Sequence, residues 1–475
     1  MLFNNQLKGR LHIMPAQKQP KKPSGKTTKP SGLRRLNSNT AGIDIGATMH
    51  YVAVPPERAE TPVRCFGTHT AALHAIVAWL QECRVTSVAM ESTGSYWIAL
   101  YQVLERAGFT VLLCNARHVK NLPGRKTDVA DSQWLQELHS YGLLSGSFRP
   151  ADQVCVLRAY LRHRDNLTRA SGAHIQHLQK ALTEMNLKLH HVLSDITGLS
   201  GMAILRAIVA GERDPHRLAA LRHERVKKSA AEIVQALEGE YRDEHLFTLR
   251  QALELYDFYL ARIAECDQAI DQTLRSWDKK LDPSTAPLPG HAKRKTAFAQ
   301  GQYELRTQLY ALTGVDLTTL PGMEVLSVQA LLSETGTDMT RWKSEKHFCS
   351  WLRLCPDNQI TGGKRARSKP HRGHNRAAQI LRLCAQSALK SKTALGAFGR
   401  RLRARMDAPR ALKALAHKLA RLIYRMLSAG VAYKDIGEHY YEERYRTHLI
   451  ARLHKQAAHF GFQLAPKPST EASVS

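Results

Sequence analysis

Apolar runs and amphipathic segments alternate along residues 41–144. Runs rich in Val, Ile, Leu and Ala predict buried strands at 41–54, 87–91 and 110–116, with a shorter strand around Cys65 and Phe66. Segments with apolar residues three or four positions apart predict helices at 70–82, 95–107 and 127–144. Because the first strands are followed by alternating helices and strands, the pattern predicts an α/β domain with a mixed sheet.

The middle of the chain has a helical pattern instead. Pro215 is the only proline between Pro150 and Pro283, and Leu, Ala, Arg, Gln, Glu and His dominate. Two long amphipathic helices are predicted, at 157–193 and 230–277, and helices that can fold back on each other favour a coiled-coil arm or a dimerisation element.

Composition indicates where the domains begin and end. Both ends of the chain carry little to bury, and 281–300 is rich in Pro, Ala and Lys. We therefore expect an α/β plus all-α protein with these parts: a disordered basic tail at 1–38, the α/β domain at 39–150, the helical arm at 151–282, a linker at 283–304, a compact helical domain at 305–445, and a C-terminal helix with a disordered tail at 446–475.

Charge narrows the class of partner. The chain has 69 Lys and Arg against 41 Asp and Glu, a net charge of +28, which indicates a polyanion such as nucleic acid. The eight cysteines include no Cys-x-x-Cys pair, so a zinc knuckle is not expected, and they suit a reducing cytoplasm. The first forty residues lack the apolar core of a signal peptide, and no apolar run is long enough for a membrane span. We expect a cytoplasmic protein with no membrane partner.

Four carboxylates form the first candidate site. Asp44 lies in the first strand, Glu91 ends a later strand, and Asp128 and Asp131 share one face at a helix start. Two Mg²⁺ ions that bridge a scissile phosphate need about this many carboxylate oxygens. The alternative for Asp128 and Asp131 is a favourable interaction with the helix dipole, and the alternative for Glu91 is a cap of the following turn. Asp44 is the strongest candidate because an acid among apolar strand residues is costly unless paired or metal-bound.

The residues of the first strand also suggest a different function. The segment IDIGAT at 43–48 resembles the first phosphate motif of actin-like sugar kinases and ATPases. Those enzymes need a second similar hairpin and a C-terminal α/β domain, whereas the C-terminal half here is helical and basic. We therefore disfavour this alternative.

A Pro-Gly turn before an amphipathic helix, at 317–336, resembles a helix-hairpin-helix. Backbone N–H groups around Gly322 at the helix start are candidates for binding a DNA phosphate. A weaker copy occurs at 193–208, and a plain helix turn is the alternative for both.

Residues 361–376 form the most basic stretch. This stretch contains too few apolar residues to pack a core. Its cations are Lys364, Arg365, Arg367, Lys369, Arg372 and Arg376. They are candidates for contacts with a phosphate backbone, and the hydroxyls of Thr361 and Ser368 among them are candidate nucleophiles for phosphoryl transfer. A solvated basic loop is the alternative.

The order of these motifs resembles the DEDD-type insertion-sequence transposases, relatives of the Piv DNA invertase that are RNA-guided recombinases. The resemblance covers roughly residues 40–445. It is carried by IDIG, MESTGSYW, NARHVKNLPGRKTDVADSQWL, LPGM and a Gly/Lys/Arg stretch that ends in NRAAQILR. Its most specific element is KTDxxD after the MESTG strand, with the LPG and GGK segments later in order.

The resemblance implies a RuvC-like RNase H fold at the N-terminus, a coiled-coil arm and a C-terminal domain with a catalytic serine. It implies that Asp44, Glu91, Asp128 and Asp131 are the acidic tetrad and hold Mg²⁺. It also implies a noncoding RNA that pairs with donor and target DNA. The active site would be composite within a dimer or tetramer, a hydroxyl of one subunit would link transiently to DNA, and excision would produce a circular form.

The chain departs from the family at the nucleophile. Many members have a serine directly before GGK, where this sequence has Thr361. Position favours Thr361 and chemistry favours Ser368, because the β-branched threonine has fewer rotamers. Besides the RNA-guided transposase, two alternatives stay open: a RuvC-like nuclease or junction resolvase without a guide, and a non-catalytic nucleic-acid-binding protein.

Overall fold

The computed structural model describes residues 34–92, 94–114, 127–288, 297–370 and 375–465. Contacts divide the chain after Arg149 into two compact units. None of the helices in these ranges has a stretch long and apolar enough to cross a lipid bilayer.

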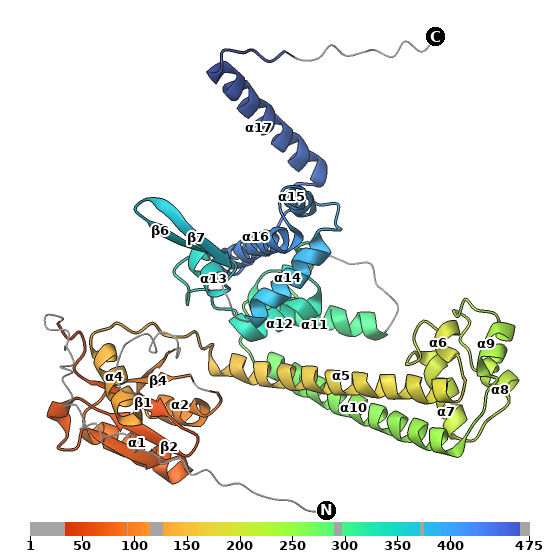
Figure 1. Cartoon of the computed structure of the whole chain (residues 1–475), viewed down its shortest axis with the longest axis horizontal. Helices are drawn as coiled ribbons and strands as arrows, with labels where there is room; N and C mark the ends of the chain where they lie inside the picture. Colours follow the sequence, from red (N-terminus) through yellow and green to blue (C-terminus); the bar gives the residue numbers. More distant parts are fainter. Residues whose placement is uncertain (1–33, 93, 115–126, 289–296, 371–374, 466–475) are drawn as a thin grey trace, which may run out of the picture. The chain divides into compact units, whose positions relative to one another are not determined.

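The first unit is built on a five-stranded mixed sheet with the order β3-β2-β1-β4-β5 (Figure 1). The antiparallel part comprises β1 (Thr40–Ile45), β2 (Met49–Ala53) and β3 (Val63–Gly67). The strands β4 (Ser87–Glu91) and β5 (Thr110–Cys114) continue the sheet in parallel with β1. The mixed α/β domain expected from the sequence is confirmed.

Helices cover both faces of this sheet. A core of aliphatic and aromatic side chains joins one face, including Ile43 and Met90, to α1 (Thr70–Glu82) and α2 (Trp97–Arg106). The other face packs against α4 (Asp128–Ser140). The strands alternate their side chains between the two faces, so residues two apart on β1 face the same helix layer.

The second unit starts with two paired 33-residue helices, α5 (Asp152–Glu184) and α10 (Asp243–Arg275) (Figure 1). Four short helices share one apolar core with the ends of this pair: α6 (Leu189–Val192), α7 (Leu199–Val209), α8 (Pro215–Ala220) and α9 (Ala230–Leu237). The prediction of one helix over 230–277 was wrong, since the chain turns between α9 and α10. Gly239 permits this turn, because a Cβ there would lie 2.3 Å from the carbonyl oxygen of Met185.

The C-terminal part is helical except for one hairpin. Its helices are α11 (Ala297–Thr313), α12 (Val325–Thr335), α13 (Glu345–Trp351), α14 (Arg376–Ala388), α15 (Ala394–Arg403), α16 (Ala408–Ala429) and α17 (Glu438–His459), with short 3₁₀ turns at Pro56–Arg58 in the first unit and Leu317–Thr319 here. The hairpin consists of β6 (Pro356–Thr361) and β7 (Lys364–Pro370), so the all-helical prediction was wrong here. Gly362 and Gly363 both have positive φ, 56° and 73°, which a tight two-residue hairpin turn requires and glycine accepts without strain.

Candidate active site

Asp44 and Glu91 lie side by side at the ends of adjacent strands. The parallel register pairs Ile43 of β1 with Met90 of β4, so Asp44 and Glu91 are the next residues on each strand. On the other side, Asp44 pairs directly with Tyr51 of β2. The sequence placed both acids on strands, and the register brings them together.

Gly42 determines how α4 lies over this pair. A Cβ at Gly42 would lie 2.3 Å from the backbone nitrogen of Gln136 and 2.4 Å from the carbonyl oxygen of Ser132, so the helix backbone touches β1 only because no side chain intervenes. The Gln136 amide donates a 3.1 Å hydrogen bond to the Thr40 hydroxyl. Thr40, Gly42 and Asp44 therefore all face α4.

The same geometry brings the helix start to Asp44. From Thr40 to Asp44 the strand advances about 13 Å, and from Gln136 back to Asp128 the helix covers about 12 Å. Gln136 is hydrogen-bonded to Thr40 and the two distances are nearly equal. Asp128 of α4 therefore comes close to Asp44 of β1. The Ser87 hydroxyl lies 2.7 Å from Nε2 of His139, which fixes the far end of α4 on β4.

The N-terminus of α4 is capped by Thr127. Its hydroxyl accepts a 3.2 Å hydrogen bond from the Ala130 N–H, and its carbonyl accepts one from Asp131. Asp128 and Asp131 lie in the first helical turn, where the helix dipole favours negative charge. The sequence expectation that both acids begin a helix is confirmed.

The four carboxylates act on one another electrostatically. The pKa of Asp44 is raised from 3.8 to about 6, first by burial and then by the negative charges of Asp128, Asp131 and Glu91. Oxygen-only ligands of this kind suit a hard divalent cation, which would relieve their repulsion. In the part of the chain that the structure describes, no group of three such side chains converges closely enough to hold a metal ion as it stands.

Sequence reasoning missed the neighbours of the acids. Tyr51 next to Asp44 has a raised pKa, because of a hydrogen bond and charge interaction with Cys65, slight burial, and the charges of Asp128 and Asp44. Cys114 pairs with Glu91, and burial, followed by the Glu91 charge, raises its pKa to about 11. Strand register was the missing information, since nothing near these residues in sequence marks them.

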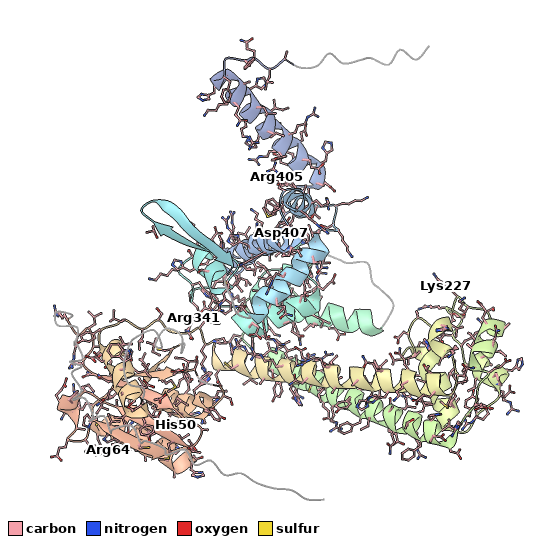
Figure 2. All side chains as sticks on the ribbon, viewed as in Figure 1. His50, Arg64, Lys227, Arg341, Arg405 and Asp407 are labelled. Carbon is pink, nitrogen blue, oxygen red and sulfur yellow. The ribbon has the colours of Figure 1, made fainter. Side chains whose placement is uncertain are left out.

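His50, labelled in Figure 2, directly precedes Tyr51 on β2, and adjacent strand residues point to opposite faces of the sheet. It is 1% exposed, and burial lowers its pKa. The histidine is thus a neutral core residue and takes no part in the acidic row.

The two candidate nucleophiles occupy different places on the β6–β7 hairpin. Thr361 is exposed, pairs with Lys364 and directly precedes the Gly362–Gly363 turn. Ser368 pairs with Asn358, away from the turn. The side chain of Ser368, like those of Lys364, Arg365, Arg367 and Lys369, lies outside the described part of the structure, as does Arg372 as a whole.

Arg376 is described and is held by acids. Its guanidinium lies 2.6 Å from Asp165 of α5 and 3.6 Å from Glu334 of α12. Glu334 is largely buried and also pairs with Arg158 and Arg162 of α5. These contacts tie α5 to the C-terminal helices, so Arg376 has a structural role in addition to its predicted contact with nucleic acid.

Gly322 has a packing role that explains why it is glycine. Its φ is 80°, and a Cβ there would lie 2.2 Å from the carbonyl oxygen of Cys384 and 2.7 Å from the nitrogen of Ala388. The Pro-Gly turn thus lets α14 approach closely. Phosphate binding at this turn stays a prediction.

Comparisons with known proteins cover both units. A family model for DEDD transposases of the IS110 type matches residues 41–187, and a model for the transposase IS116/IS110/IS902 family matches residues 315–400. The comparison with curated proteins gave no match. The two models occur in order on one chain, and the first spans all four acids while the second spans the hairpin. The chain therefore carries, in order, two domains that match IS110-type transposases, and these domains imply an enzyme that cleaves and joins DNA.

Proposed function

We propose that the protein is an RNA-guided transposase of an insertion sequence that cuts DNA with the Asp44, Glu91, Asp128 and Asp131 carboxylates in a RuvC-like domain. The observation that carries the proposal is geometric: the parallel register of β1 and β4 sets Asp44 beside Glu91. The close approach of α4 to Gly42 brings the start of that helix, with Asp128 and Asp131, towards the same pair. The sheet order β3-β2-β1-β4-β5, with acids on the adjacent central strands, supports the RuvC-like assignment.

The four carboxylates would hold Mg²⁺. When bound, such ions polarise a phosphate and activate an attacking oxygen. The residues of this chain supply the frame: Thr127 fixes the start of α4, Gly42 lets the helix reach β1, and the strand register holds Asp44 beside Glu91.

A hydroxyl of the hairpin is the proposed nucleophile, and Thr361 is favoured by its place at the turn. Exposed at the tip, it is accessible to the acids of another copy of the chain. This supports a composite site in a dimer or tetramer that acts on donor and target DNA.

Replacing Asp44 with Asn tests the acidic site. Excision of an element from a donor plasmid in Mg²⁺ should fall at least about 100-fold, because a metal-bound carboxylate contributes several kcal/mol to catalysis. Glu82→Gln, an exposed change of equal charge at the end of α1, is the matched control and should excise normally. Undiminished excision by Asp44→Asn would refute the tetrad.

The guide RNA needs its own experiment. The family resemblance alone supports it, because a net charge of +28 favours DNA and RNA equally. The protein would be purified from cells that carry its flanking DNA, and co-purifying RNA sequenced. One abundant discrete RNA that maps beside the gene is expected, whereas random cellular RNA would contradict the guide and favour the unguided nuclease.

A further inference from the structure

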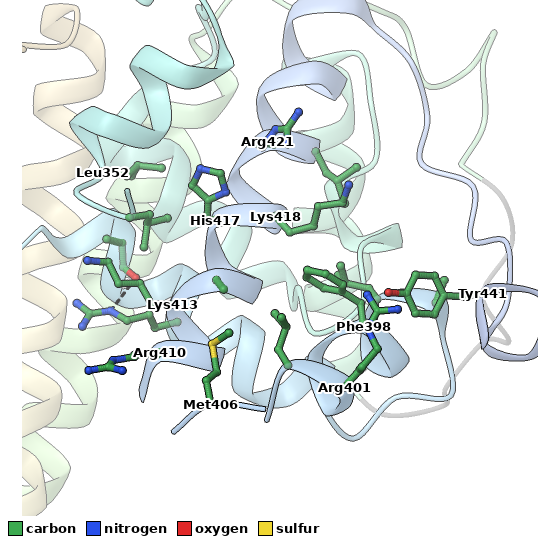
Figure 3. Close-up of a pocket in the computed structure, with 18 of the residues that line it drawn as sticks. Leu352, Phe398, Arg401, Met406, Arg410, Lys413, His417, Lys418, Arg421 and Tyr441 are labelled. Atoms are coloured by element: carbon green, nitrogen blue, oxygen red, sulfur yellow. Dashed lines mark hydrogen bonds between the residues drawn. The ribbon is translucent and has the colours of Figure 1, made fainter. Parts of the chain in front are cut away.

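A large basic groove lies in the C-terminal helices of the second unit. The segment 352–356 and helices α14, α15, α16 and α17 line a cavity of about 1680 Å³ (Figure 3). Small-molecule pockets usually measure about 300–1,000 Å³. The size of this groove therefore suits a segment of a polymer better than a metabolite.

The lining carries far more positive than negative charge. Its cations include Arg382, Arg410, Lys413, Lys418, Lys434 and Arg444. Asp407 is the one carboxylate among the described residues that line the groove, and Arg410 already lies 3.4 Å from it. Within the same part of the chain, Lys413, Lys418 and Lys434 form no ion pair.

The positive charges also crowd one another. Burial and then the charge of Arg382 lower the pKa of Lys413. The pKa of His417, one turn along α16, is lowered by burial, with Arg421 and Lys418 adding to the effect. Cations that are partly withdrawn from water and face like charges gain most from a bound polyanion.

One wall of the groove is braced by aromatic contacts. The Arg401 guanidinium lies 5.7 Å from the Phe398 ring centroid, 4.9 Å from that of Tyr441 and 3.8 Å from that of Tyr445. These contacts join α15 to α17, and Figure 3 shows Phe398, Arg401 and Tyr441 gathered on one side, with Lys413 and Arg410 on the other. Arg401 thereby holds α15 against α17 along this wall of the groove.

We propose that this groove binds the phosphodiester backbone of a nucleic-acid strand, without reading its sequence. Lys413 and Lys418 of α16 and Lys434, between α16 and α17, would contact successive phosphates. This proposal adds a binding surface to the proposed function. It assumes only that the protein binds nucleic acid, and it does not depend on the roles of the four carboxylates or of the hairpin hydroxyl.

Salt dependence of binding tests the groove. The full-length protein in EDTA would be titrated onto a labelled 30-nucleotide DNA strand and onto RNA of the same sequence, across a series of salt concentrations. Replacing Lys413, Lys418 and Lys434 with Gln should weaken binding at least tenfold. It should also reduce the slope of log K against log salt by about 2, at roughly 0.7 for each lost contact to a single strand.

Matched variants separate the groove from general charge loss. The Gln triple at Lys227, Lys279 and Lys280 removes equal charge from exposed positions outside the groove (Figure 2 shows Lys227) and should leave the slope nearly unchanged. Replacing the three groove lysines with Arg keeps the charge and should restore binding. Asp44→Asn should bind like the unchanged protein even if it fails to excise.

Each result of the salt titrations either supports or contradicts the proposal. A smaller slope with both strands supports a backbone site for either nucleic acid, and a loss with only one strand identifies that nucleic acid as the ligand. An unchanged slope with both, or an equal loss in the control triple, would overturn the proposal. Circular dichroism of each variant would exclude loss of fold as the cause.

Discussion

The four acids and the hairpin hydroxyl differ in how closely the surrounding structure packs around them. Asp44 lies two residues beyond Gly42, where β1 and α4 touch backbone to backbone, and its position follows from packing inside one unit. Thr361 lies at the tip of a two-stranded hairpin that extends from the helices, next to two glycines with open space around them (Figure 1). A packed acidic frame and a projecting hydroxyl suit the composite site proposed above, in which the hairpin would reach the acids of another subunit.

The largest effect is expected from removing the proposed nucleophile of the hairpin. Thr361→Ala should reduce excision at least about 1,000-fold, as loss of an attacking group does in other enzymes, whereas Thr361→Ser should retain it. Ser368→Ala, on the same strand pair but away from the turn, is the control and should excise normally. Excision assays on donor plasmids would measure all three.

Loss of excision in Ser368→Ala, with normal excision in Thr361→Ala, would assign the nucleophile to Ser368. If a variant with both Thr361→Ala and Ser368→Ala still cleaves DNA in Mg²⁺ at the original rate, neither hydroxyl is needed. The protein would then act as a nuclease or junction resolvase for which the acids suffice.

A smaller effect is expected from disturbing the acidic frame without changing an acid. Gly42→Ala would push α4 away from β1, because its Cβ would meet backbone atoms at 2.3 and 2.4 Å that cannot rotate aside. We expect a loss of about 1–3 kcal/mol in unfolding free energy, typical of overpacking, and reduced cleavage as Asp128 moves from Asp44. Urea denaturation and the excision assay would measure both.

Gly67→Ala on β3 is the matched control for this change. A Cβ at Gly67 would lie 3.8 Å from the Ala72 side chain, an ordinary contact. Equal losses in both variants would show that the close approach at Gly42 does not position the acids.

Sequence patterns predicted the first unit better than the second. Apolar runs reveal strands directly, so Asp44 and Glu91 could be placed on strands, and α1 was predicted at its observed bounds, Thr70–Glu82. Which acids meet depends on register and on Gly42, and tertiary contacts of this kind are not visible in one sequence. Tyr51 and Cys114 were missed for the same reason.

The hairpin was missed because its strands are charged and carry no apolar alternation. The Gly362–Gly363 pair was the available signal, since two consecutive glycines between short segments favour a tight hairpin turn. Arg376 was predicted from charge alone, whereas its ion pairs with Asp165 and Glu334 come from residues more than forty positions away. Local composition identifies the basic stretch and cannot identify which cations are already paired.

The smallest expected effect concerns pH and follows from the difference between a crowded acidic frame and an open hairpin. The pKa of Asp44 is about 6 in the folded protein and 3.8 as a model value, so the folded state binds more protons between these values. The contribution of Asp44 to the unfolding free energy of the metal-free protein should therefore fall as pH rises from about 4 to about 6. Urea denaturation at several pH values should show it as a difference between the unchanged protein and Asp44→Asn that changes over this range, whereas Thr361→Ala should follow the unchanged protein. If the acids hold Mg²⁺ as proposed, the ion at pH 7 should stabilise the unchanged protein more than Asp44→Asn, because only the folded chain brings these carboxylates together. Equal pH profiles for the protein and its Asp44→Asn variant would mean that folding does not raise the pKa of Asp44, and would contradict its burial beside the other acids.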